Sequence, residues 1–579
     1  MLNKYFQQEL SGLREIAGEF SKENPAIAPM LGEAASDPDV ERLLEGVAFL
    51  TGSIRERIDD EFPEIIHDFL RQIWPHYLRP LPASTIIGFS TFDKQKSGLV
   101  PKGTYLESHP VDGTKCRFRT CCDVHVPPVE VTEASYQEPP GKNPFIRLKF
   151  KMLDTTADLW HVEKLRLYLG GGIQTASNLY HILLTQLNRI IIRNPKTETE
   201  CILDASYLKP AGFSDEEVLI PYPSNSFQGY RLIQEYFHMP EKFMFLELSG
   251  FKNWMDRADL TEFQVELELK NTPPEASDIS KVDRNNFILS ATPAVNIFSH
   301  TAAPVTVDHK KTEYRIRPGG NDTTKYQIYS VEKVYGFIRG IGSQQQFEAF
   351  HSFRTSDAKH IYNEKIKRSP VYDRIDFSVN LAYPQGFERT DLKTLSFDIL
   401  CTNGNLPEGI DHEGISVSTG STPEFVKFKN LTQPTTATLP PLGTNMLWRL
   451  VSLLTINASS LSSPENLKSL LKLYLMKEGS RDHKRIMANE KRIDGIKSLT
   501  TKNTERLVKG SMMRGVEIRM KISRNHFACA GDLYLFGMII DNFLGLYASI
   551  NTFTKLIIDE TETGETVTWP ERIGNKQLL

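Results

Sequence analysis

The sequence has little cysteine and almost no excess charge. Six cysteines occur in 579 residues, and only Cys121 and Cys122 are adjacent. That excludes the disulfide framework of a small secreted protein and fits a reducing compartment. Lys and Arg number 68 against 72 Asp and Glu. We therefore expect no overall attraction to nucleic acid or to an anionic membrane surface.

A long uninterrupted apolar run is also missing. Residues 1–20 carry acids throughout and no apolar core, so they do not form a signal peptide. The best membrane-span candidate, residues 532–550, holds Asp541 and Asn542 at its centre. A central Asp alone costs roughly 2.5–3.5 kcal/mol on insertion. We expect no direct membrane insertion, and any membrane association must come through partners.

Local motifs for catalysis or metal binding are not found either. Cys116, Cys121, Cys122 and His125 have the spacing C-x4-C-C-x2-H, which lacks the knuckles of a zinc site. The glycines at 170–172 have no following Lys-Ser/Thr, so they indicate a tight turn and not a phosphate-binding loop. There is no GxSxG elbow, HExxH or EF-hand loop. We expect no catalytic residue, no cofactor and no metal.

Two charged clusters also have plain structural explanations. Asp37, Asp39, Glu41 and Glu45 suit a helix cap followed by a solvated helix face. Residues 477–524 carry 14 Lys or Arg against 6 Asp or Glu. Phosphate backbones could bind there, but the acids are interspersed and aromatic residues for base stacking are few. A solvated or protein-facing surface is the favoured interpretation.

The apolar residues that are present predict a helical N-terminal region, residues 1–80. Asn24-Pro25 is expected to end the first helix, Asp37-Pro38 to start the second, and Phe62-Pro63 to break it before a third helix that runs to Trp74. The region could pack on itself, or its narrow stripes could belong to a bundle shared between chains. The candidate partner-interface residues here are Phe6, Leu10, Leu13, Ala17, Phe20, Leu44 and Val47.

From about residue 84 the apolar period changes to two, which is typical of short strands. We expect a β-rich domain over residues 81–345 and a second over 346–440, with sheets packed as sandwiches or open barrels. One helix, residues 176–190, is expected to interrupt the strands. The predicted fold class is therefore α+β and multidomain.

Helices return in a C-terminal α+β assembly domain, residues 441–579. We expect helices over 444–457 and 463–475, and a last one near 532–549 that is apolar nearly all round. Such a helix needs cover on most sides. We expect a neighbouring subunit to supply part of that cover, at Ile540, Phe543, Leu546 and Tyr547.

Several segments, in order along the whole chain, resemble the TssF family, also called VasA or ImpG. They include YFQQELSGLREIAGEFSKENPAIAPMLG near the N-terminus, FQGYRLIQEYFHMPEKFMFLELSGF in the middle, and GDLYLFGMIIDNFLGLYASINTF and WPERIGNKQLL at the end. Gly404 and Asn551-Thr552-Phe553 depart modestly from the family pattern. Neither departure removes a group of known chemistry.

The resemblance implies a structural wedge subunit of the type VI secretion baseplate, a contractile injection machine similar to phage tails. It implies pairing with a second copy, binding to TssG, and assembly with TssK and TssE around the VgrG spike hub. Helices of the TssF copies and TssG would share a bundle. The location implied is cytoplasmic, at a baseplate docked to the inner-membrane complex, where the wedge supports sheath assembly and contraction.

Two other functions remain open from the residues alone. An enzyme could assemble its site from scattered residues, which would require polar groups with perturbed pKa values converging in a pocket. A nucleic-acid-binding protein could use the basic run at 477–524. The structural subunit is the favoured function.

Overall fold

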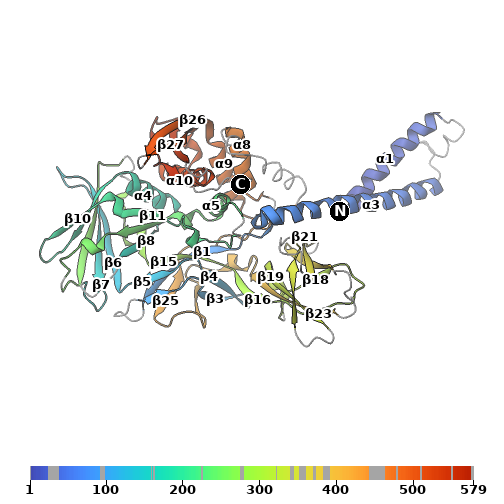
Figure 1. Cartoon of the computed structure of the whole chain (residues 1–579), viewed down its shortest axis with the longest axis horizontal. Coiled ribbons are helices and arrows are strands. Elements are labelled where there is room, and N and C mark those ends of the chain that lie inside the picture. The colour runs from blue at the N-terminus through green and yellow to red at the C-terminus, as the bar shows by residue number, and fades with distance from the viewer. Residues whose placement is uncertain are drawn as a thin grey trace. The chain divides into compact units, whose positions relative to one another are not determined.

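The structure, a computed structural model, has an α+β fold, as predicted (Figure 1). Its described part divides into two compact units. The helices of residues 2–74 make up the first unit, and the elements from Pro75 to Ile573 make up the second. The structure describes residues 2–23, 38–91, 98–157, 160, 163–222, 226–257, 259–273, 279–320, 322–338, 344–350, 360–369, 373–382, 392–442, 463–477, 480–508, 511–548 and 552–574.

The first unit is built from α1 (Leu2–Glu23) and α3 (Pro38–Ile73). The predicted end of α1 and the predicted start of α3 are confirmed. The break expected at Phe62-Pro63 is wrong, because α3 continues through Pro63 to Ile73. An interior proline removes one backbone hydrogen bond at a cost of about 3 kcal/mol. Helical turns on both sides hold this 36-residue helix together, so one lost bond does not end it.

A six-stranded sheet of the second unit has the order β24-β3-β4-β15-β1-β25, and β2 pairs with β5 beside it. Alternate residues of its strands enter one apolar core, which includes Ile87, Leu106 and Phe118. The sheet joins strands far apart in the sequence, and it spans the predicted boundary at residue 345. The strands are β1 (Ser84–Thr91), β2 (Gly98–Val100), β3 (Tyr105–Val111), β4 (Thr114–Thr120), β5 (Val124–Val126), β15 (Ala291–Val295), β24 (Ile415–Ser418) and β25 (Val426–Asn430).

A five-stranded sheet has the order β10-β9-β13-β7-β6, and a four-stranded sheet has the order β11-β12-β8-β14. The five-stranded sheet contains β6 (Val129–Gln137), β7 (Phe145–Met152), β9 (Leu187–Arg193), β10 (Glu200–Asp204) and β13 (Glu262–Leu269). The four-stranded sheet contains β8 (Lys164–Leu169), β11 (Leu208–Ala211), β12 (Phe245–Ser249) and β14 (Phe287–Leu289).

The helix predicted over residues 176–190 is partly wrong. It forms α4 (Ile173–Thr185), and the chain then enters β9 at Leu187. Residues 190–192 are three consecutive isoleucines, whose branched side chains favour a strand. Pairing of β9 with both β10 and β13 favours the strand further.

An eight-stranded sheet follows the path β16-β23-β19-β20-β21-β22-β18, with β17 paired to β23. All its pairs are antiparallel except β20 with β21. Its strands are β16 (Phe298–Thr301), β17 (Val305–Thr306), β18 (Tyr314–Ile316), β19 (Gln327–Ile338), β20 (Gln344–Ala349), β21 (Ile361–Arg368), β22 (Ile375–Ala382) and β23 (Leu392–Thr402).

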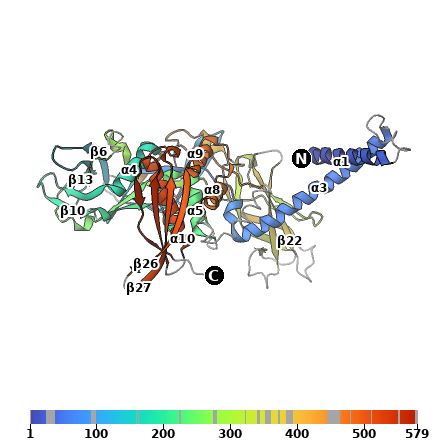
Figure 2. The ribbon, with the colours of Figure 1, turned by 90° about the horizontal axis from the view of Figure 1, so that it is seen from above.

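The C-terminal part of the second unit places helices against a last sheet, of order β26-β27-β28-β29, in which β30 also pairs β28. Figure 2 shows β26 and β27 as a long hairpin. Ser463 is the N-cap of α8, as expected, whereas the helix predicted over 444–457 lies outside the described residues. The elements are α5 (Gln228–His238), α8 (Pro464–Leu473), α9 (His483–Asp494), α10 (Ala530–Tyr547), β26 (Ile496–Val508), β27 (Ser511–Ile522), β28 (Thr552–Glu560), β29 (Thr566–Thr568) and β30 (Arg572–Ile573).

Candidate assembly surfaces

The two helices of the first unit form an antiparallel hairpin. They lie close together at Gly52, where an added Cβ would lie 3.1 Å from the backbone nitrogen of Phe6. Arg14 pairs with Glu41 at 2.8 Å, and Arg55 pairs with Glu9. These partly exposed ion pairs fix the register of the helices and stabilise the hairpin only weakly.

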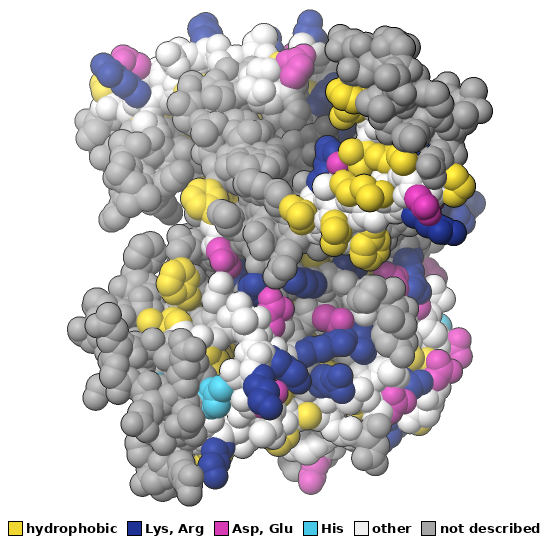
Figure 3. All heavy atoms as spheres, turned by 90° about the vertical axis from the view of Figure 1, so that its right-hand side faces the viewer, with side chains coloured by type: hydrophobic (Ala, Val, Ile, Leu, Met, Phe, Trp, Pro, Cys, Tyr) yellow, Lys and Arg dark blue, Asp and Glu magenta, His cyan; other side chains and the backbone are white. Residues whose placement is uncertain are grey.

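Much of the apolar surface of this hairpin stays open. Leu43 is 68% exposed and Leu50 is 63% exposed. Two packed helices can each bury only one stripe, so a second stripe on the same helix is left without cover. Figure 3 shows one face of the molecule on which apolar side chains gather. The exposed large apolar residues of the hairpin are Ile16, Phe20, Leu43, Val47, Phe49, Leu50, Ile54 and Phe69.

The predicted interface residues of this region divide into two groups. Phe20 and Val47 are exposed, as a partner surface requires. The half-buried residues face the space between the helices and are Phe6, Leu10, Leu13, Ala17 and Leu44. The sequence prediction missed Leu43 and Leu50. Together with Val47 and Ile54 they form a stripe whose 4-3-4 spacing is typical of a helix that packs against another helix.

The last helix, α10, is covered mainly by its own chain. Ile540 and Phe543 have no exposed surface, so these two predicted interface residues are core residues of the second unit. Phe543 packs against Phe227 and Tyr230, which flank and begin α5. Leu546 and Tyr547 are only partly buried. A neighbouring subunit could therefore cover only the last turn of α10, where Leu546 and Tyr547 lie.

Buried ion pairs hold α10 in place at two points. Arg492 donates to Asp532 at 3.0 Å in the first turn, and Arg572 donates to Asp541 near the middle. Burial raises the pKa of Asp541 to about 6, although the Arg572 guanidinium acts in the opposite direction.

Among the described residues, no helix is both long and apolar enough to cross a bilayer.

A groove of about 630 Å³ opens at the C-terminal end of α10. Its floor is the part of the β26–β27–β28 sheet face that α10 does not reach, including Val516, Ile518 and Thr554. Leu544 and Tyr547 form its helical wall. The groove is therefore continuous with the half-buried last turn of the helix.

The residues considered for metal and phosphate binding have structural roles. Cys116, Cys121 and Cys122 are buried, and burial raises the pKa of the Cys116 thiol to about 11, which disfavours the thiolate. In the part of the chain that the structure describes, no group of three or more His, Cys, Asp or Glu side chains could hold a metal. The turn at 170–172 is filled by Asn286, which donates to the carbonyl oxygen of Gly170 at 3.0 Å.

The charged clusters are largely neutralised within the chain. Asp39 and Glu41 occupy the first turn of α3, where acids interact favourably with the helix dipole. In the basic run, Arg492 pairs with Asp532, and Arg481 pairs with Asp373 at 2.7 Å. Further pairs of that run are Lys477–Glu490, Arg485–Asp482, Arg506–Glu571, Arg514–Glu505, Arg519–Asp559 and Arg524–Glu560.

Most groups with strongly shifted pKa values are buried, and among them His76, Tyr222, Tyr230 and Tyr474 pack together in the core. Burial lowers the pKa of His76 and of His238 to about 3. The His238 side chain contacts the carbonyl oxygen of Pro82 at 2.9 Å, an ordinary buried hydrogen bond. Lys242 and Glu235 form a fully buried ion pair, and Glu235 also accepts from the backbone N–H of Leu219 at 2.9 Å. These bonds satisfy the pair as a structural element of the core.

Comparison with known proteins gives consistent matches over the whole chain. The family model of the type VI secretion system protein TssF matches residues 1–576. The type VI secretion system component TssF1 of Pseudomonas aeruginosa is 29% identical over 629 aligned positions, covering 100% of this chain and 99% of that protein.

Two chains of solved structures share the fold of this chain over nearly its whole length. A chain of the type VI TssK–TssF–TssG baseplate subcomplex, determined by cryo-electron microscopy, has a TM-score of 0.76 at 28% identity, covering 93% of this chain and 99% of the other. A chain of the baseplate complex from the type VI secretion system has a TM-score of 0.63 at 26% identity, covering all of both chains.

Proposed function

The chain belongs to the TssF family of type VI secretion proteins, and from this premise we propose that it is a structural wedge subunit of the baseplate. The full-length likeness to chains of solved baseplate complexes supports this proposal. The observation that carries it is the open apolar surface of the α1–α3 hairpin. A contiguous exposed apolar surface of this kind marks a protein interaction site.

The proposed partners are a second copy of this chain, TssG and TssK. A TssF-like chain occurs together with TssG and TssK in the similar subcomplex. The hairpin offers two helices with an uncovered apolar stripe, which suits a helical bundle completed by helices of other subunits. We extend the proposal to TssE and the VgrG hub as further neighbours in the wedge, on the ground of the family resemblance.

Burial of the hairpin stripe can drive this assembly. Complete burial of a Leu or Phe side chain stabilises by about 1.5–3 kcal/mol relative to exposure. Three or four such residues per hairpin would therefore offset a substantial part of the entropy lost on association. The proposed mechanism is mechanical: a rearrangement of the wedge triggers contraction of the sheath. The chain contributes binding surfaces to the wedge and needs no catalytic residue, cofactor or metal.

The proposed location is the cytoplasm, at the baseplate docked to the inner-membrane complex. Nucleic-acid binding is not part of the proposal, since the basic run at 477–524 is extensively paired with acids. Elemental analysis of the purified protein tests the proposal that the chain needs no metal, and stoichiometric zinc would contradict it.

The direct test replaces the open stripe. In the double variant Leu43→Asp with Leu50→Asp, two charges would enter the proposed bundle. We expect the variant to keep its far-ultraviolet circular dichroism and to lose its complex with TssG in a native mass measurement. The matched control is Glu45→Lys, which changes charge on the opposite face of α3 and is expected to assemble normally. Normal assembly of the double variant would refute the proposal.

A further inference from the structure

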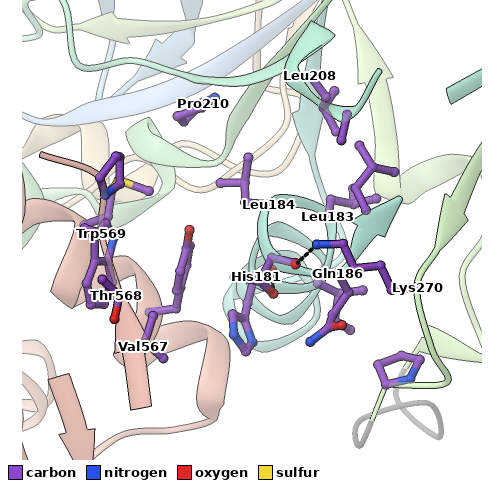
Figure 4. A pocket seen from close by; sticks show the side chains of 18 of the residues that line it. His181, Leu183, Leu184, Gln186, Leu208, Pro210, Lys270, Val567, Thr568 and Trp569 are labelled. Carbon is purple, nitrogen blue, oxygen red and sulfur yellow. Dashed lines mark hydrogen bonds between the residues drawn. The ribbon is translucent and has the colours of Figure 1, made fainter. Parts of the chain in front are cut away.

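A large open cavity of about 770 Å³ lies in the second unit (Figure 4). The C-terminal turn of α4, β11 and the side of α10 form three of its walls. Residues 565–570, which contain β29, form the fourth. The volume is typical of pockets that bind a ligand.

Among the described residues, β29 is the last strand of its sheet, and no strand pairs with its outer edge. The N–H of Trp569 donates to the carbonyl of Leu556 at 3.0 Å, and the N–H of Glu560 donates to the carbonyl of Glu565 at 2.9 Å. In an antiparallel ladder these bonds direct the carbonyl of Glu565 and the backbone groups of Val567 and Trp569 toward β28. The N–H and C=O groups of Thr566 and Thr568 therefore point away from the sheet. Within the described chain, no backbone or side-chain group bonds to them.

The open edge is held rigidly by the residue that follows it. Trp569 is 2% exposed, and its ring stacks on Tyr534 with centroids 5.4 Å apart. The same indole packs on α10 where Gly537 leaves room, because an added Cβ there would lie 2.4 Å from the ring. A strand edge fixed in this way needs little ordering when it binds, which lowers the entropy cost of association.

The rest of the cavity offers apolar surface and neutral polar groups. Leu184, Pro210 and Met538 supply the apolar lining. Burial lowers the pKa of His181 to about 4, so its imidazole is neutral at physiological pH, and its Nδ1 has no hydrogen-bond partner in the described chain. Of the charged lining residues, Lys270 donates to the carbonyl of Thr185 at 3.4 Å and Arg572 pairs with Asp541, whereas Glu565 is exposed.

We propose that the cavity receives an extended peptide segment of another baseplate subunit, which adds a strand to the outer edge of β29. The backbone groups of Thr566 and Thr568 would bind its main chain, and an apolar side chain of the segment would enter the space beside Leu184 and Met538. Strand addition to an open edge is a general mode of peptide recognition, in which main-chain bonds give affinity and pockets give specificity. The inference rests on the proposed function, because the segment comes from a neighbour in that assembly.

Amide hydrogen exchange tests the open edge directly. In the isolated chain, the amides of Thr566 and Thr568 should exchange faster than those of Val567 and Trp569, which bond to β28. In the complex reconstituted with the partner subunits of the proposed baseplate, exchange at Thr566 and Thr568 should slow by about tenfold or more. Unchanged exchange in a complex that has formed would overturn the inference.

A matched pair of variants separates strand addition from simple contact. Thr568→Pro removes only an outward N–H, and edge strands tolerate proline when that N–H faces away from the sheet. Thr568→Val keeps the N–H and the shape of the side chain. Immobilised overlapping peptides covering the partner subunits serve as the probe.

We expect a segment to bind the wild type and Thr568→Val equally and Thr568→Pro about tenfold more weakly. Equal binding by the two variants, or no bound peptide, would contradict strand addition. If the chain forms no complex at all, the proposed function fails; if the complex forms with an unprotected edge, only this inference fails.

Discussion

The hairpin of α1 and α3 and the last helix α10 both have apolar faces that look too large for one chain, yet they end in opposite environments. On the hairpin, Leu43 and Leu50 remain more than half exposed. On α10, Ile540 and Phe543 are fully buried by α4, α5 and β28 of the same unit. The comparison teaches that an apolar face shows that cover is needed, whereas only the fold shows which chain supplies it.

The largest expected effect concerns the interior of the hairpin. Leu13 is half-buried between the helices, so Leu13→Asp should place a charge in their contact and abolish both the hairpin and the complex with TssG. The strands of the second unit should remain folded, because the helices of the first unit form a compact unit of their own. Circular dichroism with native mass measurement checks both statements. If the variant assembles normally, the hairpin is not the assembly surface, and it does not differ from α10 in this respect.

A core truncation in α10 should act on stability and not on assembly. Phe543→Ala removes a fully buried ring and should lower the free energy of unfolding by about 3–5 kcal/mol. Leu50→Ala, at a position 63% exposed, should change it by less than about 0.5 kcal/mol in the isolated chain. Denaturant unfolding monitored by fluorescence measures both. Equal effects of the two substitutions would show that the difference in burial has no energetic consequence.

Acid should destabilise the second unit through its buried histidines. Burial lowers the pKa of His238 to about 3 from an ordinary value of 6.5, so the unfolded chain takes up a proton first as the pH falls. The stability contributed by neutral His238 is complete above pH 6.5 and falls by about 1.4 kcal/mol per pH unit toward pH 3. Unfolding free energies measured from pH 7 to pH 4 should show this slope. His238→Gln, which cannot titrate, should give a shallower one, and an unchanged slope would contradict the assignment to His238.

The smallest expected effect concerns the last turn of α10. Leu546 is partly buried, and the next residue, Tyr547, lines the groove of about 630 Å³. If a second copy covers this turn, Leu546→Ala should weaken self-pairing by about 1 kcal/mol, or roughly fivefold, without changing the fold. Ile202→Ala, at an exposed apolar position on β10, is the control. Sedimentation at several concentrations measures the pairing, and equal behaviour of both variants would restrict self-pairing to the hairpin.

Local sequence patterns predicted much of the fold. Period-two runs marked strands such as β7 and β13, and Ser463-Pro464 marked the start of α8. The prediction that Pro63 breaks the helix was wrong. The free energy lost with one hydrogen bond is small compared with the stability that the remaining turns of a long helix contribute. Residues 187–190, which were predicted to be helical, belong to β9 because pairing on both sides of this strand outweighed the helical pattern.

The candidate surfaces were less predictable, because exposure depends on contacts between distant segments. The stripe of Leu43, Val47, Leu50 and Ile54 was visible as a 4-3-4 pattern, but its exposure was not. The sequence does not predict the open edge of β29, because TVT is typical of any short strand. The order of the described strands shows that one edge of β29 has no neighbour.

Hydrogen exchange compared between the isolated chain and its complex with TssG tests the central contrast most directly. We expect the amides of residues 2–23 and 38–73 to become more slowly exchanging on assembly, while those of α10 up to Phe543 stay unchanged because their cover is already complete. Slowing within α10 with no change in the two hairpin helices would contradict the proposal that the hairpin is the assembly surface.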